Sequence, residues 1–190
     1  MASGKAPQKD AYALILQAID RGLYRAGSGG LKQGLLARDG RSLIVASLDH
    51  GQMAQLYVVR AELEGLAARL AAQHASPEEI RVMQEMVAAD QALVSDPDAL
   101  ALANRRFHRQ IHLASHNTYL VQQLDLVHRS MALMATTSLA AEGRGPVALE
   151  EHSEIVAAIA ARDGDRAAQA LKDHLSTAFE VRLKEEAASI

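Results

Sequence analysis

The sequence predicts an all-α protein, an antiparallel bundle of about six helices preceded by a short region of a different kind. Three observations lead to this class. After residue 48 the chain is rich in Ala and Leu at helical spacing, and helix-start signals recur along it. Only residues 41–47 have the pattern of a strand. Since one strand cannot make a sheet alone, helices must supply the core.

The first 48 residues differ from the rest in glycine content and charge. Seven of the 12 glycines lie between residues 22 and 51. Residues 1–48 hold seven basic and three acidic residues, a balance of +4, against 13 and 20, or −7, for the remainder. Residues 11–23 have the apolar spacing of one helix, which Gly22 ends. We therefore expect two regions, residues 1–48 and 49–190.

Helix-start signals divide the second region into six segments. Ser76 is followed by Pro77 and then by Glu79, the pattern of a capping box with proline at the first helical position. Asp96 and Pro97 repeat the cap and the proline. The other signals are Asn117, Gly145-Pro146 and Arg162-Asp-Gly-Asp165. We predict helices over residues 50–74, 77–94, 97–115, 117–140, 146–162 and 165–187.

Each predicted helix carries an apolar stripe that should face its neighbours. In the first helix this stripe consists of Leu56, Val59, Leu63, Leu66 and Leu70. With only two Phe and four Tyr in the chain, the core must be aliphatic. Stacking platforms for single-stranded nucleic acid are therefore not expected.

Composition and motifs exclude several classes of protein. The chain has no Cys, so disulfides and thiolate metal sites are excluded, and no apolar run approaches the ~20 residues of a spanning helix. Because no signal-peptide pattern opens the chain, we expect a cytoplasmic protein without a membrane partner. Nucleophile-elbow, Walker and dinucleotide motifs do not occur, and Gly27-Ser-Gly-Gly30 lacks the strand–helix context of a phosphate loop.

Histidine spacing suggests a metal site. Asn104, His108 and His112 recur every four residues on one helical face, and His116 follows. His152 and His174 each lie 11 residues from the turn residue 163, which puts them at the same level of an antiparallel hairpin. The alternative is a set of solvated or hydrogen-bonded histidines, which we expect for His50, His74, His116 and His128.

Four ordered motifs carry a family resemblance. They begin at Val59-Arg-Ala-Glu-Leu-Glu, Asn104-Arg-Arg-Phe-His, Glu151-His-Ser-Glu and Ala170-Leu-Lys-Asp-His. Over about residues 49–185 the chain resembles the FCD effector-binding domain of GntR-family transcriptional regulators, of the FadR-like subfamily. The resemblance implies a helical, usually dimeric domain in which an acidic or amide residue and three histidines hold a divalent metal beneath a small carboxylate. Those residues here are Asn104, His108, His152 and His174.

One position departs from the family pattern, because the first ligand is commonly Asp and Asn104 stands in its place. An amide oxygen can coordinate but adds no negative charge, which favours an anionic effector. Zinc is the first expectation for this donor set, with nickel or manganese as alternatives. Arg60 is the predicted partner of the effector carboxylate, and the alternative is an ordinary salt bridge to Glu64 or to a neighbouring helix.

The resemblance extends to a winged helix-turn-helix at the amino terminus. Residues 12–27 resemble its first helix and turn, and residues 35–47 resemble its wing. Between them, where the recognition helix should lie, only a short Gly-rich stretch, residues 27–34, is present. Natural loss and artificial deletion are both compatible with this gap. We expect a remnant whose DNA binding is weak or absent, since base recognition needs a helix in the major groove.

The function predicted from these features is effector sensing by a homodimeric, non-enzymatic regulator that binds a small organic acid through its metal. One alternative is a metal-dependent hydrolase or lyase that uses the same three histidines. It would need a general base, and although Glu151 and Glu154 lie near His152, spacing places neither. A second alternative is a helical dimerisation module without a ligand.

Overall fold

The computed structural model describes residues 36–39, 42–45, 48–131 and 137–188. The chain divides into two compact units, residues 1–47 and 48–190. In the first unit, β1 (Leu36–Asp39) and β2 (Ser42–Val45) pair as an antiparallel hairpin within the stretch that resembles a wing. The helix predicted over residues 11–23 and the gap at residues 27–34 lie outside the described residues.

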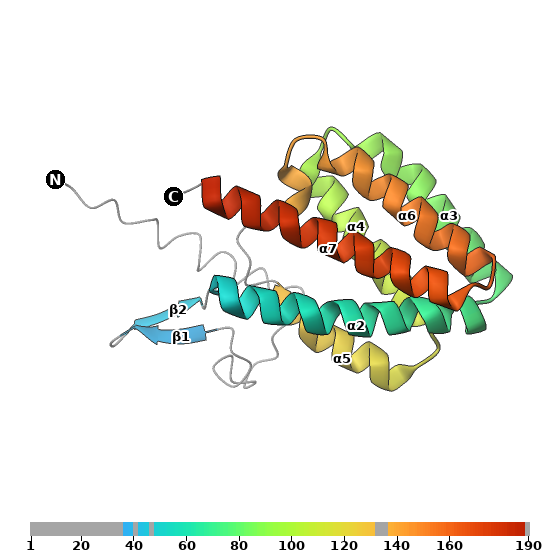
Figure 1. Ribbon diagram of the computed structural model, residues 1–190, viewed down its shortest axis with the longest axis horizontal. Helices are drawn as coiled ribbons and strands as arrows, with labels where there is room; N and C mark the ends of the chain where they lie inside the picture. The colour runs from blue at the N-terminus through green and yellow to red at the C-terminus, as the bar shows by residue number, and fades with distance from the viewer. Residues whose placement is uncertain (1–35, 40–41, 46–47, 132–136, 189–190) are drawn as a thin grey trace. The chain divides into compact units, whose positions relative to one another are not determined.

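The second unit is the helical bundle that the sequence predicts, with six α-helices among the described residues (Figure 1). They are α2 (His50–His74), α3 (Pro77–Asp90), α4 (Pro97–Ala114), α5 (Thr118–Met131), α6 (Arg144–Ala160) and α7 (Gly164–Ala188). Two short 3₁₀ helices follow α3 and α5, namely η2 (Gln91–Leu93) and η3 (Ser138–Ala140). The predicted all-α class is confirmed.

Helix starts follow the capping chemistry of the sequence. Ser76 and Glu79 form a complete capping box ahead of α3. Asp96 and Asn117 each accept a hydrogen bond from the backbone N–H three residues later, at 3.0 and 3.1 Å. These contacts satisfy N–H groups that the first helical turn leaves unpaired. Helix α6 begins at Arg144, two residues before the predicted start at residue 146. The residue before it, Gly143, adopts φ 73°, a left-handed conformation favourable to glycine.

The prediction of one helix over residues 117–140 is wrong in its last part. Residues 138–140 form η3, and the preceding Thr137 is extended, with φ −102° and ψ 140°. The Thr137 hydroxyl accepts a hydrogen bond from the N–H of Leu139 at 3.3 Å. A threonine side chain that bonds the nearby backbone competes with helical hydrogen bonds, which accounts for the separate short turn.

Helices α2 and α7 run antiparallel and side by side in Figure 1, and α2 also contacts α4, α5 and α6. The face of α2 toward its end is made of fully buried alanines, namely Ala67, Ala68, Ala71 and Ala72. At Gly65 an added Cβ would lie 2.8 Å from Cε of Lys172 and 3.4 Å from the carbonyl oxygen of Ala168. Small residues therefore permit the close approach of these two helices.

The apolar stripe predicted for the first helix coincides only in part with its buried face, since Leu63 and Leu70 are partly buried and pack against the main core. Val59 is 50% exposed and Leu66 is 41% exposed, whereas Arg60 and Glu64 are buried. A search for apolar spacing misses this face because alanines and paired polar residues occupy it.

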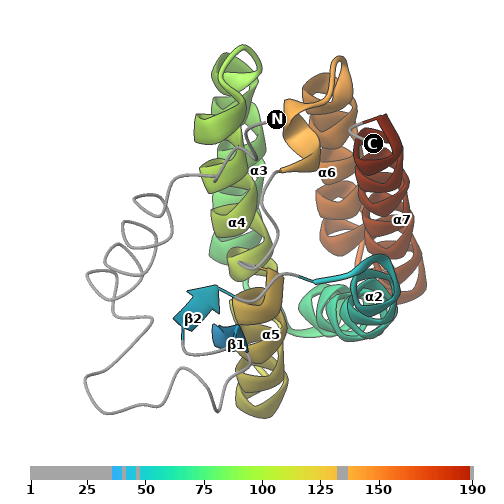
Figure 2. The same cartoon turned by 90° about the vertical axis from the view of Figure 1, so that its left-hand side faces the viewer.

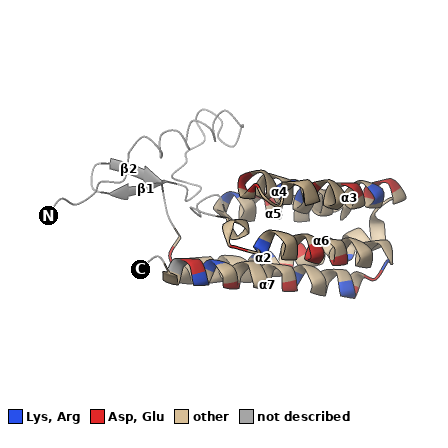
Figure 3. Cartoon of the chain, turned by 90° about the horizontal axis from the view of Figure 1, so that it is seen from above, with Lys and Arg blue, Asp and Glu red and all other residues tan. Residues whose placement is uncertain are grey.

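The main core lies among α2, α3, α4, α5, α6 and α7 and is aliphatic apart from Phe107. Figure 2 shows α6 beside α7 and α3 beside α4, the pairs that enclose this core. In Figure 3, Lys and Arg positions are interspersed with Asp and Glu positions along the helices. Within the described ranges, no helix combines the length and apolar character needed to cross a membrane.

Candidate metal centre

Three histidines from three helices meet inside the bundle. His108 lies on α4, His152 on α6 and His174 on α7, and one nitrogen of each lies within 4.8 Å of the others. The Nε2 atoms of His108 and His174 are 3.3 Å apart. Donors bound to one zinc ion at about 2.0–2.1 Å lie roughly 3.4 Å from each other, so this spacing suits a shared ion. We call these three residues the histidine centre.

The α6–α7 hairpin brings His152 and His174 to the same level. The turn is stabilised by Asp163, which accepts a hydrogen bond from the N–H of Arg166 at 3.0 Å. Equal numbers of residues on the two sides of the turn place both rings at one height, and their centroids lie 4.8 Å apart. From α4, His108 approaches this pair, with its ring centroid 5.2 Å from that of His174.

Carboxylates orient two of the three imidazoles. Glu64 on α2 accepts a hydrogen bond from Nδ1 of His108, and Glu151 on α6 accepts one from Nδ1 of His174 at 2.7 Å. With the proton fixed on Nδ1, the Nε2 lone pairs of both rings point toward each other. Such carboxylate–histidine pairs fix the tautomer and raise the basicity of metal ligands.

Two further polar groups of the predicted site lack partners. Both ring nitrogens of His152 are buried and, among the described residues, have no hydrogen-bond partner. The same holds for Oδ1 of Asn104, one helical turn before His108. Phe107 stacks on His152 at a centroid distance of 4.2 Å and holds the ring in place. Buried donors and acceptors without partners cost about 1–3 kcal/mol each, so these atoms fit a bound cation better than an empty interior.

Burial keeps the histidine centre neutral. Removal from water lowers the pKa of His108 to about 3, although the nearby Glu64 carboxylate acts in the opposite direction. Burial also lowers the pKa of His152 and His174, and the charge of Arg144 adds to the effect at both. Although burial alone would raise it, the pKa of Glu64 lies well below its usual range because of Arg60 and His108. Neutral imidazoles and an ionised carboxylate are the states that bind metals.

Arg60, the predicted effector partner, is engaged with a residue of its own helix. Its Nε donates to Oε1 of Glu64 at 2.6 Å, and both side chains are buried. The guanidinium carbon also lies 5.7 Å from the ring centroid of Tyr57. The salt bridge to Glu64 that the sequence left as an alternative is therefore present. Glu64 contacts both Arg60 and His108 and so connects the arginine to the histidine centre.

Arg144, which the sequence analysis did not identify, is a second buried arginine beside the histidine centre. Its Nη2 donates to Oε2 of Glu151 at 2.6 Å and lies 3.4 Å from Nδ1 of His174. Its Nε and Nη1 are buried without a partner in the part of the chain that the structure describes. It precedes His152 by eight residues, about two helical turns, which puts both on one face of α6, but the helix predicted from the sequence begins only at residue 146 and so leaves Arg144 outside it.

A second cluster adjoins the histidine centre on the other side of Glu64. Glu64, His112 and His128 each offer a ligand atom within 4.8 Å of the others. Nε2 of His128 lies 3.2 Å from Oε1 of Glu64, and Nε2 of His112 lies 3.5 Å from Oε2. The sequence grouped His128 with solvated or hydrogen-bonded histidines because nothing in its spacing fixes the rotation of α5 against α2 and α4.

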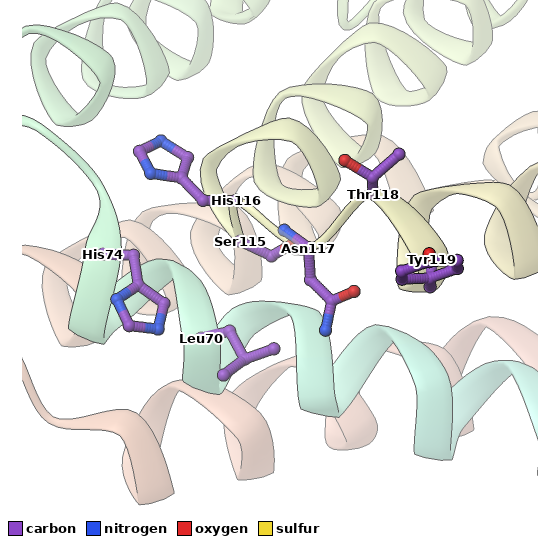
Figure 4. A pocket seen from close by; sticks show the side chains of 7 residues that line it. All are labelled: Leu70, His74, Ser115, His116, Asn117, Thr118 and Tyr119. Carbon is purple, nitrogen blue, oxygen red and sulfur yellow. The ribbon is translucent and has the colours of Figure 1, made fainter.

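Other candidate residues lie elsewhere. His116 binds Glu79 at 3.0 Å on the surface, and Glu154 pairs with Arg166 at 2.7 Å, so neither belongs to the centre. A pocket of about 340 Å³, lined by the end of α2 and the turn between α4 and α5, shares no residue with either cluster. Figure 4 shows His74 and Leu70 on one side of it and the turn residues on the other.

Comparisons with known proteins give a consistent family. A model of the FCD domain matches residues 55–177, a range that includes all four predicted metal ligands. The HTH-type transcriptional regulator YdhC of Bacillus subtilis (strain 168) is 25% identical over 150 residues, which cover 76% of this chain and 66% of that protein. The chain therefore spans just under two thirds of the length of that relative.

Solved structures share the fold. Escherichia coli McbR/YncC superposes with a TM-score of 0.74 at 18% identity, covering 82% of this chain and 80% of that one. A GntR transcriptional regulator from Rhodococcus sp. RHA1 gives a TM-score of 0.63 at 20% identity, with 95% of this chain and 87% of that chain covered. At these identities the likeness concerns the fold alone.

Proposed function

Because the chain belongs to the GntR family of transcriptional regulators and carries that family's FCD domain, we propose that residues 49–190 sense a small carboxylate through a bound divalent metal. Asn104, His108, His152 and His174 would hold the ion, with zinc as the first expectation. The observation that carries this proposal is the pair of facing Nε2 atoms, 3.3 Å apart in a neutral, buried centre.

The chain supplies a suitable charge environment for an anionic effector. Arg60 is paired with Glu64, and Arg144 with Glu151, so these four charges cancel. Asn104 and the imidazoles are neutral, which leaves the charge of the ion uncompensated. A bound divalent ion would supply the positive charge and open coordination positions that a carboxylate oxygen can occupy.

The effector carboxylate has two candidate arginine partners. Arg60 was predicted from the family motif, but Glu64 already occupies its Nε. Arg144 has Nε and Nη1 buried and, so far as the structure describes the chain, unpartnered, which makes it the stronger donor. Charge-assisted hydrogen bonds from a buried guanidinium to a carboxylate contribute about 1.5–3 kcal/mol.

A sensing role is favoured over the hydrolase or lyase alternative by the state of Glu151. A general base must be able to take a proton from substrate or water. Glu151 is the carboxylate beside His174, and it already accepts hydrogen bonds from His174 and Arg144. It is therefore a positioning residue, and its pKa is lowered because these hydrogen bonds outweigh the effect of burial.

The regulatory output of this chain would depend on a homodimer that presents its amino-terminal unit to DNA. The absence of sequence for a recognition helix between residues 27 and 34 underlies our proposal that this chain binds operator DNA weakly or not at all. The proposed role is therefore that of the sensing part of a cytoplasmic regulator.

Zinc competition with a chromophoric chelator tests the metal site. We expect the double variant His152→Ala with His174→Ala to lose the ion held by the histidine centre, while His116→Ala, a surface histidine on Glu79, keeps it. With zinc-loaded protein, acetate, lactate and citrate should raise the melting temperature of the wild type and less so that of Arg144→Gln. Unchanged zinc affinity in the double variant would contradict the proposal.

A further inference from the structure

We propose that Glu64, His112 and His128 form a second site for a divalent transition-metal ion, separate from the histidine centre and joined to it through Glu64. The three side chains come from α2, α4 and α5, three helices that pack against one another. Two imidazoles and one carboxylate are a donor set that suits zinc, cobalt, nickel or ferrous iron. This site does not depend on the proposed carboxylate sensing.

The separations of the two histidines from the Glu64 carboxylate suit a single ion held among the three side chains. Donor atoms bound at about 2.0–2.2 Å to one ion lie roughly 3–3.6 Å apart. The two separations from Glu64 oxygens are 3.2 Å to Nε2 of His128 and 3.5 Å to Nε2 of His112. The ring centroids of His112 and His128 are 5.1 Å apart at an interplanar angle of 63°, so the two rings converge on the carboxylate without stacking.

A cluster of ordinary hydrogen bonds does not account for His112. His128 is explained by a hydrogen bond to Glu64, but His112 is 1% exposed and neither of its ring nitrogens has a hydrogen-bond partner among the described residues. Its contact with Glu64 is too long for a normal hydrogen bond. A buried imidazole without a hydrogen-bond partner, next to a carboxylate and a second imidazole, is suited to bind a metal ion.

Glu64 retains acceptor capacity on the side of this cluster. A carboxylate has about four lone-pair directions, two on each oxygen. Arg60 uses one direction on Oε1, and His108 uses one on Oε2. Nε2 of His128 lies 3.2 Å from Oε1 and Nε2 of His112 lies 3.5 Å from Oε2, so the second acceptor direction of each oxygen is available to this cluster. Arg60 therefore neutralises part of the local charge without occupying the position of the ion.

His128 gives the site access to solvent. Its side chain is 27% exposed, whereas those of His112 and Glu64 are 1% and 0% exposed. An ion can therefore exchange past the His128 ring, and its open coordination positions would be filled from that side. The histidine centre is more enclosed, since its three residues are at most 3% exposed.

Metal stoichiometry separates the two sites. Native mass spectrometry of the full chain with zinc should show two ions in the wild type. We expect one ion in His128→Ala, one in His112→Leu and one in the His152→Ala, His174→Ala double variant. His116→Ala should keep both ions, because that histidine lies in the turn after α4 and binds Glu79. Circular dichroism checks that each variant is folded. Should His112→Leu unfold, the result for His128→Ala, a change at a partly exposed position, is used in its place.

The outcomes distinguish failure of this site from failure of the histidine centre. One ion in the wild type, retained in His128→Ala and His112→Leu and lost in the double variant, would overturn the second site and leave the first intact. One ion that is lost only in His128→Ala and His112→Leu would support the second site and contradict the first. No ion in the wild type would overturn both.

The shared carboxylate gives a second test. Glu64→Gln removes a ligand of the second site and the orienting partner of His108, so zinc affinity should fall at both sites. Loss of an orienting partner typically lowers metal affinity about 10–100-fold. Glu62→Gln, on the same helix but paired with Lys172 at the surface, is the matched control and should change neither affinity. Equal affinities in Glu64→Gln and Glu62→Gln would contradict the shared role.

Discussion

Both helices of the α6–α7 hairpin have an apolar portion next to the turn and a polar position farther from it. Near the turn, Ile155, Ile159 and Leu171 are completely buried in the main core. Farther along, His152 and His174 are as deeply buried but face Arg144 and each other. The same two helices thus carry a portion that stabilises the fold and a portion whose polar atoms reduce its stability.

The difference indicates which residues serve folding and which serve binding. Apolar burial contributes about 25 cal/mol per Å², so the portion near the turn accounts for helix packing without any ligand. Buried polar groups without partners act against folding unless something binds them. Local violations of packing rules of this kind are expected at functional sites.

Truncation in the apolar portion should have the largest effect on stability. Ile159→Ala leaves a cavity beside Leu171 and Ile155 and should reduce the free energy of unfolding by about 2–5 kcal/mol. In metal-free protein, His152→Leu should have little effect or increase stability, because it removes unpartnered polar atoms. Urea unfolding in chelator compares the two. An equal loss in both variants would show that His152 belongs to the structural core.

Acidification should have the second largest effect on the free energy of unfolding, through the histidines of the polar portion. Burial holds the pKa of His108 at about 3 against an ordinary 6.5, and it also lowers the pKa of His152 and His174. Below pH 6.5 the histidines of the unfolded chain bind protons that those of the folded chain do not. The free energy of unfolding therefore decreases as the pH is lowered. The slope can reach about 1.4 kcal/mol per pH unit for each histidine.

The two carboxylates beside the histidine centre do not obscure this effect between about pH 7 and pH 5. The pKa of Glu64 and that of Glu151 are lowered from 4.5, so the stability they contribute is lost only as pH falls below 4.5. Urea unfolding of metal-free protein at these two pH values measures the slope, and His152→Leu should make it smaller. A stability independent of pH in this range would mean that the three rings are solvated.

Asn104→Asp should have the smallest effect on folding and a specific effect on binding. An added carboxylate supplies charge to the ion, so zinc affinity should rise about tenfold or more, equivalent to about 1.4 kcal/mol. The extra negative charge should also weaken binding of an anionic effector. Chelator competition measures the first effect and titration with citrate the second. An unchanged zinc affinity would place Asn104 outside the coordination sphere.

The sequence predicted the helical class because its caps are local signals. Ser76, Asp96 and Asn117 lie where the structure uses them. The separate short helix η3 was not predictable from periodicity, since it depends on the extended Thr137, whose side chain bonds the nearby backbone. The exposed Val59 was also misjudged, because burial on α2 is set by its neighbours and not by its own apolar pattern.

For the candidate site, spacing from the turn explains why His152 and His174 are close together. Glu64 and His128 could not be linked to them from spacing, since the rotation of one helix against another depends on tertiary packing. Arg144 was missed because the predicted helix began two residues after it.

Anomalous scattering from a crystal grown with zinc tests the central claim most directly. We expect a zinc peak about 2.0–2.2 Å from Nε2 of His108, Nε2 of His174 and a ring nitrogen of His152. Zinc peaks confined to surface histidines, with no peak among these three rings, would contradict it.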